Sequence, residues 1–138
     1  MVTEAYSEWV VEDDFCNGRP PLETVGVRMV RDVADFELMK TRLLNASHVV
    51  LGFLGQVAGY RTTDEAVGDP AVHDYLATLM GNEVIPLLPG PDGMDLAEYQ
   101  QTLLKRFANP AISDQLSRLC RRGSVSYTHL TLPTILRV

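Results

Sequence analysis

Between residues 34 and 60 the apolar side chains recur at three- and four-residue intervals, which is the period of an amphipathic α-helix. The second half of this stretch is apolar on nearly every side, as is typical of a helix buried at the centre of a domain. Three glycines interrupt it, each costing about 1 kcal/mol of helix propensity, so we expect them to admit another backbone at close range. The apolar positions are Phe36, Met39, Leu43, Leu44, Val50, Leu51 and Leu54, and the glycines are Gly52, Gly55 and Gly59.

The residues before this stretch follow a different pattern. Residues 9–11 and 25–30 are aromatic, β-branched and apolar, which favours two strands. Between them, Asn17-Gly18 and Pro20-Pro21 predict a turn or an extended connector, because proline excludes a helix there. We therefore expect a boundary near residue 31, with strands and their connector over residues 1–31.

The residues after this stretch carry the signals of several shorter helices. A short polar side chain followed by proline or by an acidic first turn is typical of a helix start. These signals predict a mainly α domain over residues 32–124. The expected caps are Asp32 for the long helix, Thr63 or Asp64 for a short helix to Val67, Asp69 for a helix to about Ile85, Asp95 for a helix to Phe107, and Asn109 for a helix to about Arg122.

Charge and cysteine usage exclude several classes of partner. The net charge of -6 and the pI near 4.9 argue against nucleic acid or an anionic membrane. The longest apolar run, around residues 49–59, is shorter than the roughly 20 residues that span a bilayer. We expect no signal peptide, because Met1 is not followed by a basic and then an apolar segment, and Cys16 and Cys120 match no metal or redox spacing. We expect a reduced, cytoplasmic setting and no bound metal.

One short segment of the predicted long helix concentrates chemically useful groups. Lys40, one of only two lysines in the chain, is followed by Asn45 and His48. On an ideal α-helix, at about 100° per residue, His48 lies about 80° and Asn45 about 140° round from Lys40. The three side chains would then share one broad face, and one pocket could contact them all.

Two interpretations of this trio stand side by side. In the structural one, which the spacing alone favours, Lys40 extends its amine to solvent, Asn45 bonds a neighbouring turn and His48 is a satisfied core residue. In the chemical one, a partly buried lysine amine serves as general acid or base. Asn45 would then hold developing charge on an oxygen, and His48 would bind a neighbouring hydroxyl. This set suits a proton transfer that accompanies hydride transfer on an alcohol or ketone.

Residues 37–48 closely resemble the signature of the polyol-specific long-chain dehydrogenases. This family includes mannitol 2-dehydrogenase, fructuronate reductase and tagaturonate reductase. Further blocks resemble the family in the same order along the chain, and together they cover roughly residues 6–124. These blocks are residues 9–15, 18–20, 26–27, 55–60 and 106–112.

The resemblance implies a role for each site residue. Lys40 would be the general acid/base, Asn45 the group that polarises the substrate oxygen, and His48 a substrate ligand. Glu37 would lie on the proton path to Lys40, and Arg118 would contact substrate. The implied reaction moves a hydride between NAD or NADP and a sugar alcohol or keto-sugar without metal. Mannitol–fructose is the first choice of substrate pair, and reduction of fructuronate or tagaturonate is the alternative.

The resemblance also implies a fold, from which this chain departs in two places. The family's helical domain resembles the C-terminal domain of 6-phosphogluconate dehydrogenase and packs on an N-terminal Rossmann domain. No Gly-x-Gly-x-x-Gly lies between a strand and a helix here, so we expect the NAD(P)-binding domain outside this chain and the chain alone to be inactive. Ser126 stands where the family has a substrate-binding lysine, and residues 125–138 resemble translated adapter sequence. A different class remains open: a truncated, non-catalytic helical domain that binds no cofactor.

Overall fold

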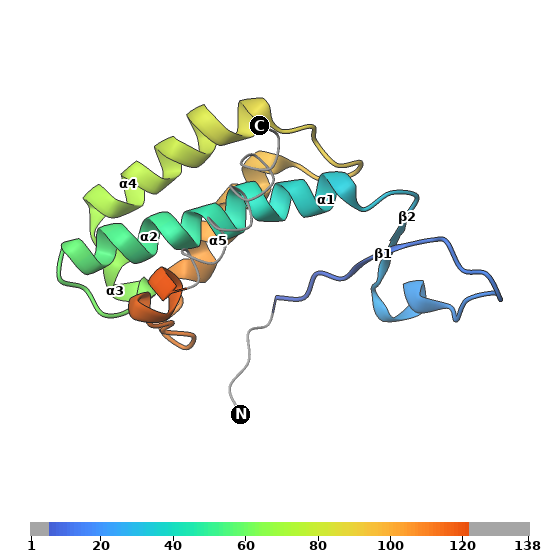
Figure 1. Ribbon diagram of the computed structural model, residues 1–138, viewed down its shortest axis with the longest axis horizontal. Coiled ribbons are helices and arrows are strands. Elements are labelled where there is room, and N and C mark those ends of the chain that lie inside the picture. Colours follow the sequence, from blue (N-terminus) through green and yellow to red (C-terminus); the bar gives the residue numbers. More distant parts are fainter. Residues whose placement is uncertain (1–5, 122–138) are drawn as a thin grey trace, which may run out of the picture.

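The computed structural model describes residues 6–121 and shows a mainly helical protein with a small two-stranded sheet at one end (Figure 1). This confirms the expected fold class. The predicted tail of residues 125–138, with Ser126, lies outside the described residues. The elements are β1 (Val10–Glu12), the 3₁₀ helix η1 (Leu22–Val25), β2 (Arg28–Val30), α1 (Ala34–Met39), the π-helix η2 (Lys40–Asn45), α2 (Ala46–Val57), α3 (Thr63–Val67), α4 (Pro70–Thr78), the π-helix η3 (Leu79–Val84), the 3₁₀ helix η4 (Ile85–Leu87) and α5 (Leu96–Phe107), and residues 116–121 are also helical.

The elements α1, η2 and α2 form one continuous helix at the centre of the molecule, as the apolar spacing predicted. The carboxylate of Asp32 accepts a hydrogen bond from the backbone N–H of Ala34 at 2.8 Å, so Asp32 does mark the start. The helix ends just before Gly59, whose φ of 91° is a left-handed conformation that favours glycine. No helix in the described part of the chain is both long and apolar enough to cross a membrane.

Two of the three glycines in this helix admit a neighbouring segment at close range. A Cβ atom at Gly52 would lie 3.4 Å from the backbone nitrogen of Cys120, and one at Gly55 would lie 2.5 Å from the Cδ1 atom of Leu116. The helical residues 116–121 therefore pack directly on α2. This confirms that the glycines serve close packing, although Gly59 serves helix termination instead.

Aspartate caps begin the next two long helices as expected. The carboxylate of Asp69 accepts from the N–H of Ala71 at 2.8 Å, and that of Asp95 accepts from the N–H of Ala97 at 2.8 Å. The cap predicted for α3 was wrong by one residue. Thr62, in extended conformation, precedes α3, and the carboxylate of Glu65 accepts from its backbone N–H.

The helix predicted to start at Asn109 was also wrong, because the chain is helical only from residue 116. The N–H of Thr63 donates to the carbonyl of Asp114 at 2.9 Å, and the N–H of Leu116 donates to the carbonyl of Arg61 at 3.0 Å. These hydrogen bonds join residues 61–63 to residues 114–116. They use backbone groups that would otherwise bond to each other within a helix. Ser113 has a φ of 43°, which also interrupts a helix.

A second π-helical segment, η3, continues α4 and packs against η2. A change from four-residue to five-residue hydrogen bonding leaves a carbonyl without its usual backbone donor. At this junction the buried side chain of Gln100 donates from Nε2 to the carbonyl of Ala77 at 2.7 Å. Gly81 makes room for it, since a Cβ atom there would lie 3.3 Å from the Oε1 atom of Gln100.

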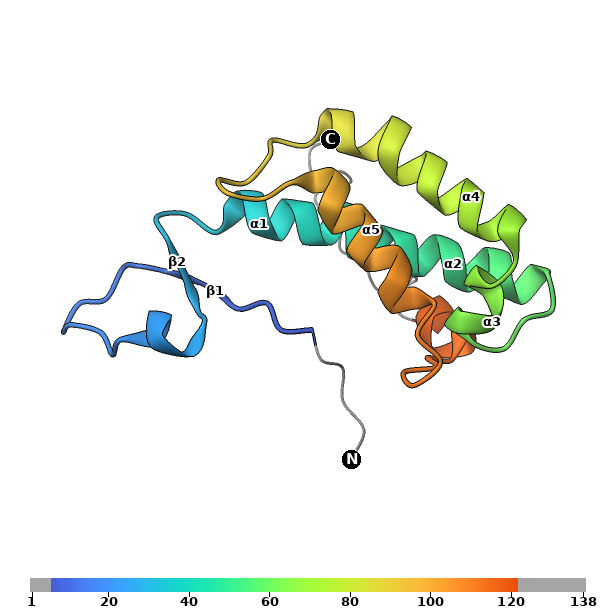
Figure 2. The ribbon, with the colours of Figure 1, turned by 180° about the vertical axis from the view of Figure 1, so that it is seen from behind.

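The two short strands run parallel, with Val10 opposite Arg28. The side chain of Arg28 ties this sheet to the helices, because its Nη1 atom donates to the carbonyls of Asp92 and Gly93 at 3.3 and 3.2 Å. Seen from behind, β2 leads directly into α1, and α5 crosses the central helix (Figure 2). Val25, expected in the second strand, instead ends η1, because Gly26 takes a left-handed φ of 85° and the strand starts after it.

The Gln100 bond gives a prediction about stability. Gln100→Met should lower the free energy of unfolding by about 1–3 kcal/mol, because it leaves the Ala77 carbonyl without that donor. Gln101 is the next residue of the same helix and is exposed, so Gln101→Met should stay within about 0.5 kcal/mol. Urea denaturation of both variants is the measurement. An equal loss of unfolding free energy in the two variants would show that the Gln100–Ala77 hydrogen bond does not stabilise the fold.

Candidate active site

A cavity of about 710 Å³ lies beside the junction of α1 and η2, and Lys40 forms part of its wall. The volume falls in the range of small-molecule sites. Three parts of the chain border it: the central helix, α5, and the segment that leads into β1. The residues that carry its polar chemistry are Glu37, Lys40, Tyr99, Arg106, Tyr6 and Glu8.

Lys40 and Glu37 are the two predicted site residues that the structure brings together in this cavity. They are three residues apart, and such positions share one face of a helix. Lys40 is exposed, as the structural interpretation of the trio expected, and the partial burial that the chemical interpretation requires is not present within the described residues. The cavity that Lys40 lines is also bordered by α5 and by the segment before β1.

Asn45 lies at the end of the π-helical segment that starts at Lys40. The N–H of Ala46 donates to the carbonyl of Thr41, five residues back, and this is the bonding that defines a π turn. The angles of about 80° and 140° expected for an ideal α-helix therefore do not apply between Lys40 and the later residues. Asn45 is exposed and does not line the cavity.

His48 is half-buried on α2, and its imidazole lies against the ring of Phe107. The ring centroids are 4.8 Å apart and the planes are inclined by 54°. This separation is within the range that aromatic pairs prefer. Neither His48 nor Asn45 is part of the wall of the Lys40 cavity, so this cavity does not bring the trio together.

Arg118 lies on the helical residues 116–121 and is paired with Asp114. Its Nε atom donates to the Oδ1 atom of Asp114 at 2.8 Å, and Nη2 bonds the other carboxylate oxygen. The hydrogen bond with Asp114 raises the pKa of the Arg118 guanidinium. The same helical segment packs against Gly52 through Leu119 and Cys120, and Arg118 is not part of the wall of the Lys40 cavity.

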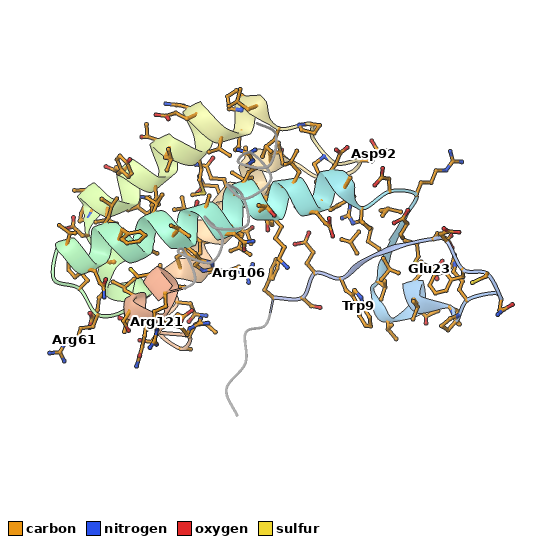
Figure 3. All side chains as sticks on the ribbon, in the orientation of Figure 1. Trp9, Glu23, Arg61, Asp92, Arg106 and Arg121 are labelled. Atoms are coloured by element: carbon orange, nitrogen blue, oxygen red, sulfur yellow. The ribbon has the colours of Figure 1, made fainter. Side chains whose placement is uncertain are left out.

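Arg106 and Tyr6 are cavity residues to which the sequence assigned no role. The guanidinium carbon of Arg106 lies 4.1 Å from the centroid of the Tyr6 ring, on the side of α5 that faces the segment before β1 (Figure 3). The Tyr6 hydroxyl donates to the carboxylate of Glu8 at 2.7 Å. Arg106 belongs to one of the blocks that carried the family resemblance, which was the available signal. No sequence signal pointed to Tyr6, because its position in the cavity depends on how the segment before β1 packs against α5.

The cavity wall mixes cations, carboxylates and neutral hydroxyls. Burial raises the pKa of Tyr99 to about 12, and the charge of Glu8 adds to that shift. Burial also raises the pKa of Tyr6, and its bond to Glu8 contributes. Both tyrosines are therefore neutral at physiological pH. Such a wall offers many hydrogen bonds and no single dominant charge, which suits a neutral ligand rich in hydroxyls.

The segment of residues 6–9 also lines a second, smaller cavity. This space of about 330 Å³ lies on the side of the sheet and includes Arg28, Asp95 and Glu98. Tyr99 lines both cavities. Within residues 6–121, no three histidine, cysteine, aspartate or glutamate side chains gather as a metal site.

Comparison with known proteins gives a consistent result. Residues 32–137 match the family model described as the mannitol dehydrogenase C-terminal domain. The chain is 49% identical over 135 residues to mannitol dehydrogenase 2 of Saccharomyces cerevisiae, covering 98% of this chain and 27% of that protein. It is 44% identical over 138 residues to mannitol 2-dehydrogenase of Emericella nidulans, covering 98% of this chain and 28% of that protein.

Two solved structures share the fold. A substrate-free D-sorbitol dehydrogenase superposes with a TM-score of 0.79 at 46% identity, covering 81% of this chain and 23% of that one. Mannitol 2-dehydrogenase of Pseudomonas fluorescens, in a ternary complex with NAD and D-mannitol, superposes with a TM-score of 0.76 at 47% identity, covering 83% and 23%. The chain spans about a quarter of the length of these relatives.

The raised pKa of Tyr99 predicts how stability depends on pH. In the unfolded chain this phenol ionises near pH 10, whereas in the folded chain it ionises near pH 12. Its contribution is therefore complete below about pH 10 and is lost as the pH rises toward 12. Urea denaturation across this window should show a steeper loss of stability for the unaltered chain than for Tyr99→Phe.

The exposed Tyr75 provides the control for this prediction. Tyr75 is 52% exposed on α4, so Tyr75→Phe should leave the pH dependence as it is. If Tyr99→Phe and Tyr75→Phe behaved alike, the burial of the Tyr99 hydroxyl would not control stability in this range.

Proposed function

This chain belongs to the mannitol dehydrogenase C-terminal domain family, and from that membership we propose that it supplies the acid–base part of a polyol dehydrogenase. The complete enzyme would move a hydride between NAD(P) and a sugar alcohol or keto-sugar. The observation that supports this most directly is the position of Lys40, which lines a cavity of ligand size together with Glu37.

In this proposal Lys40 handles the proton of the reaction. During oxidation of a secondary alcohol, the C–O single bond becomes a carbonyl, the hydroxyl proton passes to the neutral amine of Lys40, and the hydride leaves the same carbon. NAD(P), when bound, accepts that hydride. In the reverse direction Lys40 protonates the new alkoxide. Glu37, on the same wall and one turn earlier, then exchanges the proton with solvent.

Asn45, His48 and Arg118 would hold the substrate. The carboxamide of Asn45 would donate to the reacting oxygen and stabilise charge that develops there. His48 and Arg118 would bind hydroxyls farther along the substrate. A rise of about 1.5 Å per residue puts Asn45 and His48 on the order of 10 Å farther along the helix than Lys40. A substrate with several hydroxyls, together with the long side chain of Lys40, could bridge that distance.

The cofactor would be held mainly by a domain that residues 6–121 do not contain. Within those residues the sheet consists of β1 and β2 alone, and no glycine-rich loop links a strand to a helix. We propose that residues 1–31 continue the sheet of that domain. The domain would also cover the open side of the cavity and exclude water from the Lys40 amine, and burial disfavours a charged amine. The related Pseudomonas fluorescens enzyme, whose complex holds NAD and D-mannitol, supports this choice of cofactor.

A neutral substrate pair, mannitol–fructose, fits the charges better than a keto-uronate does. A uronate carboxylate needs an unneutralised cation. Arg118, the arginine assigned to substrate, is already paired with Asp114. The names of the relatives agree with this choice. The uronate pair stays the second candidate, and a cytoplasmic location is part of the proposal because Cys16 and Cys120 are both free thiols.

The role of Lys40 can be tested by substitution in the complete enzyme. Lys40→Ala should lower kcat about 10²- to 10⁴-fold, the usual contribution of a general acid/base, while NADH still binds. Lys105→Ala is the matched control, because Lys105 is the other lysine of the chain, is exposed on α5 and is not part of the cavity wall. Steady-state assays with fructose and with fructuronate would also rank the two substrates. Unchanged kcat in Lys40→Ala would rule out the assigned role.

The proposal that another domain holds the cofactor gives a second test, on the 138-residue chain itself. A fluorescence titration with NADH should show no saturable binding, because the cofactor is held by the other domain. Saturable enhancement of NADH fluorescence would contradict the proposal that the cofactor is bound by the other domain. A non-catalytic domain would not bind NADH either, so the Lys40→Ala assay in the complete enzyme is the experiment that separates it from this proposal.

A further inference from the structure

We infer that Phe107 positions the imidazole of His48 for substrate. This inference rests on the proposed function, in which His48 is a substrate ligand, and adds a residue to which neither the sequence nor the family match gives a role. The observation behind it is the direct ring contact between the two side chains, 4.8 Å between centroids at an inclination of 54°.

A ring contact can orient an imidazole without using its hydrogen-bonding groups. Both nitrogens lie in the plane of the imidazole and act as donor or acceptor there. Packing against a phenyl ring restricts how the imidazole turns about its side-chain bonds and consumes neither nitrogen. An aliphatic side chain at position 107 would fill space but present no flat surface, and a hydroxyl or amide would compete for a nitrogen.

A residue that positions another side chain must itself be held in place, and Phe107 is. It is the last residue of α5, only 4% exposed, and it lies in the same apolar core as Leu103 and Leu104. The backbone that carries His48 is fixed as well. One turn farther along α2, Gly52 packs closely against Leu119 and Cys120, and this contact restricts movement of α2 there.

The end of α5 also connects His48 with the Lys40 cavity. Arg106 immediately precedes Phe107, lines that cavity and stacks on Tyr6. Successive helical residues point about 100° apart, so adjacent side chains reach different surroundings. The C-terminal end of α5 therefore contacts the Lys40 cavity through Arg106 and His48 through Phe107. It holds these two parts of the proposed site in a fixed relative position.

A double-mutant cycle in the complete enzyme tests this inference. His48→Ala, Phe107→Leu and the double variant are compared by KM for the polyol and by kcat. If Phe107 acts through His48, Phe107→Leu raises KM on the order of tenfold, with a smaller change in kcat, and adds nothing once His48 is already alanine.

Loss of core packing alone is controlled separately. Leu76 is fully buried on α4 and has no part in the site, so Leu76→Ala weakens the fold while leaving KM unchanged. Phe107→Met gives a second non-aromatic variant in case Phe107→Leu does not fold. An effect of Phe107→Leu that persists in full in the His48→Ala background overturns the inference, because the two residues would then act independently.

The cycle also distinguishes the two levels of the argument. If His48→Ala leaves KM unchanged, the proposed role of His48 fails, and the inference about Phe107 fails with it. If His48→Ala raises KM and Phe107→Leu does not, the role of His48 stands and the inference about Phe107 alone is wrong.

Discussion

The close packing of α2 against the helical residues 116–121 is the contact on which the rest of the structure depends. It requires the absence of side chains at Gly52 and Gly55, where a Cβ atom would meet Leu119 or Leu116. With this contact made, the helix from residue 34 to residue 57 is held on several sides and carries the candidate site on one element. Its N-terminal half borders the Lys40 cavity, and its C-terminal half presents His48 to α5.

Local signals in the sequence predicted the parts of the fold that local interactions decide. Asp69 and Asp95 cap their helices because a short carboxylate can reach the first free N–H groups of the same segment. The long helix followed from its apolar period. The failures occurred where distant segments meet. The backbone hydrogen bond from Thr63 to Asp114 takes the place of the first turn of the helix predicted after Asn109. The two π-helical segments pack against each other, and no local sequence pattern predicts that contact.

The candidate site shows the same division. The positions of Lys40, Asn45 and His48 on one helix were predictable, and the family resemblance implied roles for them that remain proposals. Their exposures were not, because they depend on what lies across the cavity. Tyr6 and Arg106 close one side of it through a stacked pair. Lys40 is exposed within the described residues, and the chain spans about a quarter of the length of the relatives compared above.

The central claim is that Lys40 transfers the proton of a polyol dehydrogenase. A crystal structure of the complete enzyme with NAD and D-mannitol tests it most directly. The account predicts the Nζ atom of Lys40 within about 2.6–3.2 Å of the oxygen on the carbon that faces the nicotinamide, as proton transfer requires. A polyol bound elsewhere, or bound there with a different side chain at that oxygen and Lys40 turned to solvent, would contradict it.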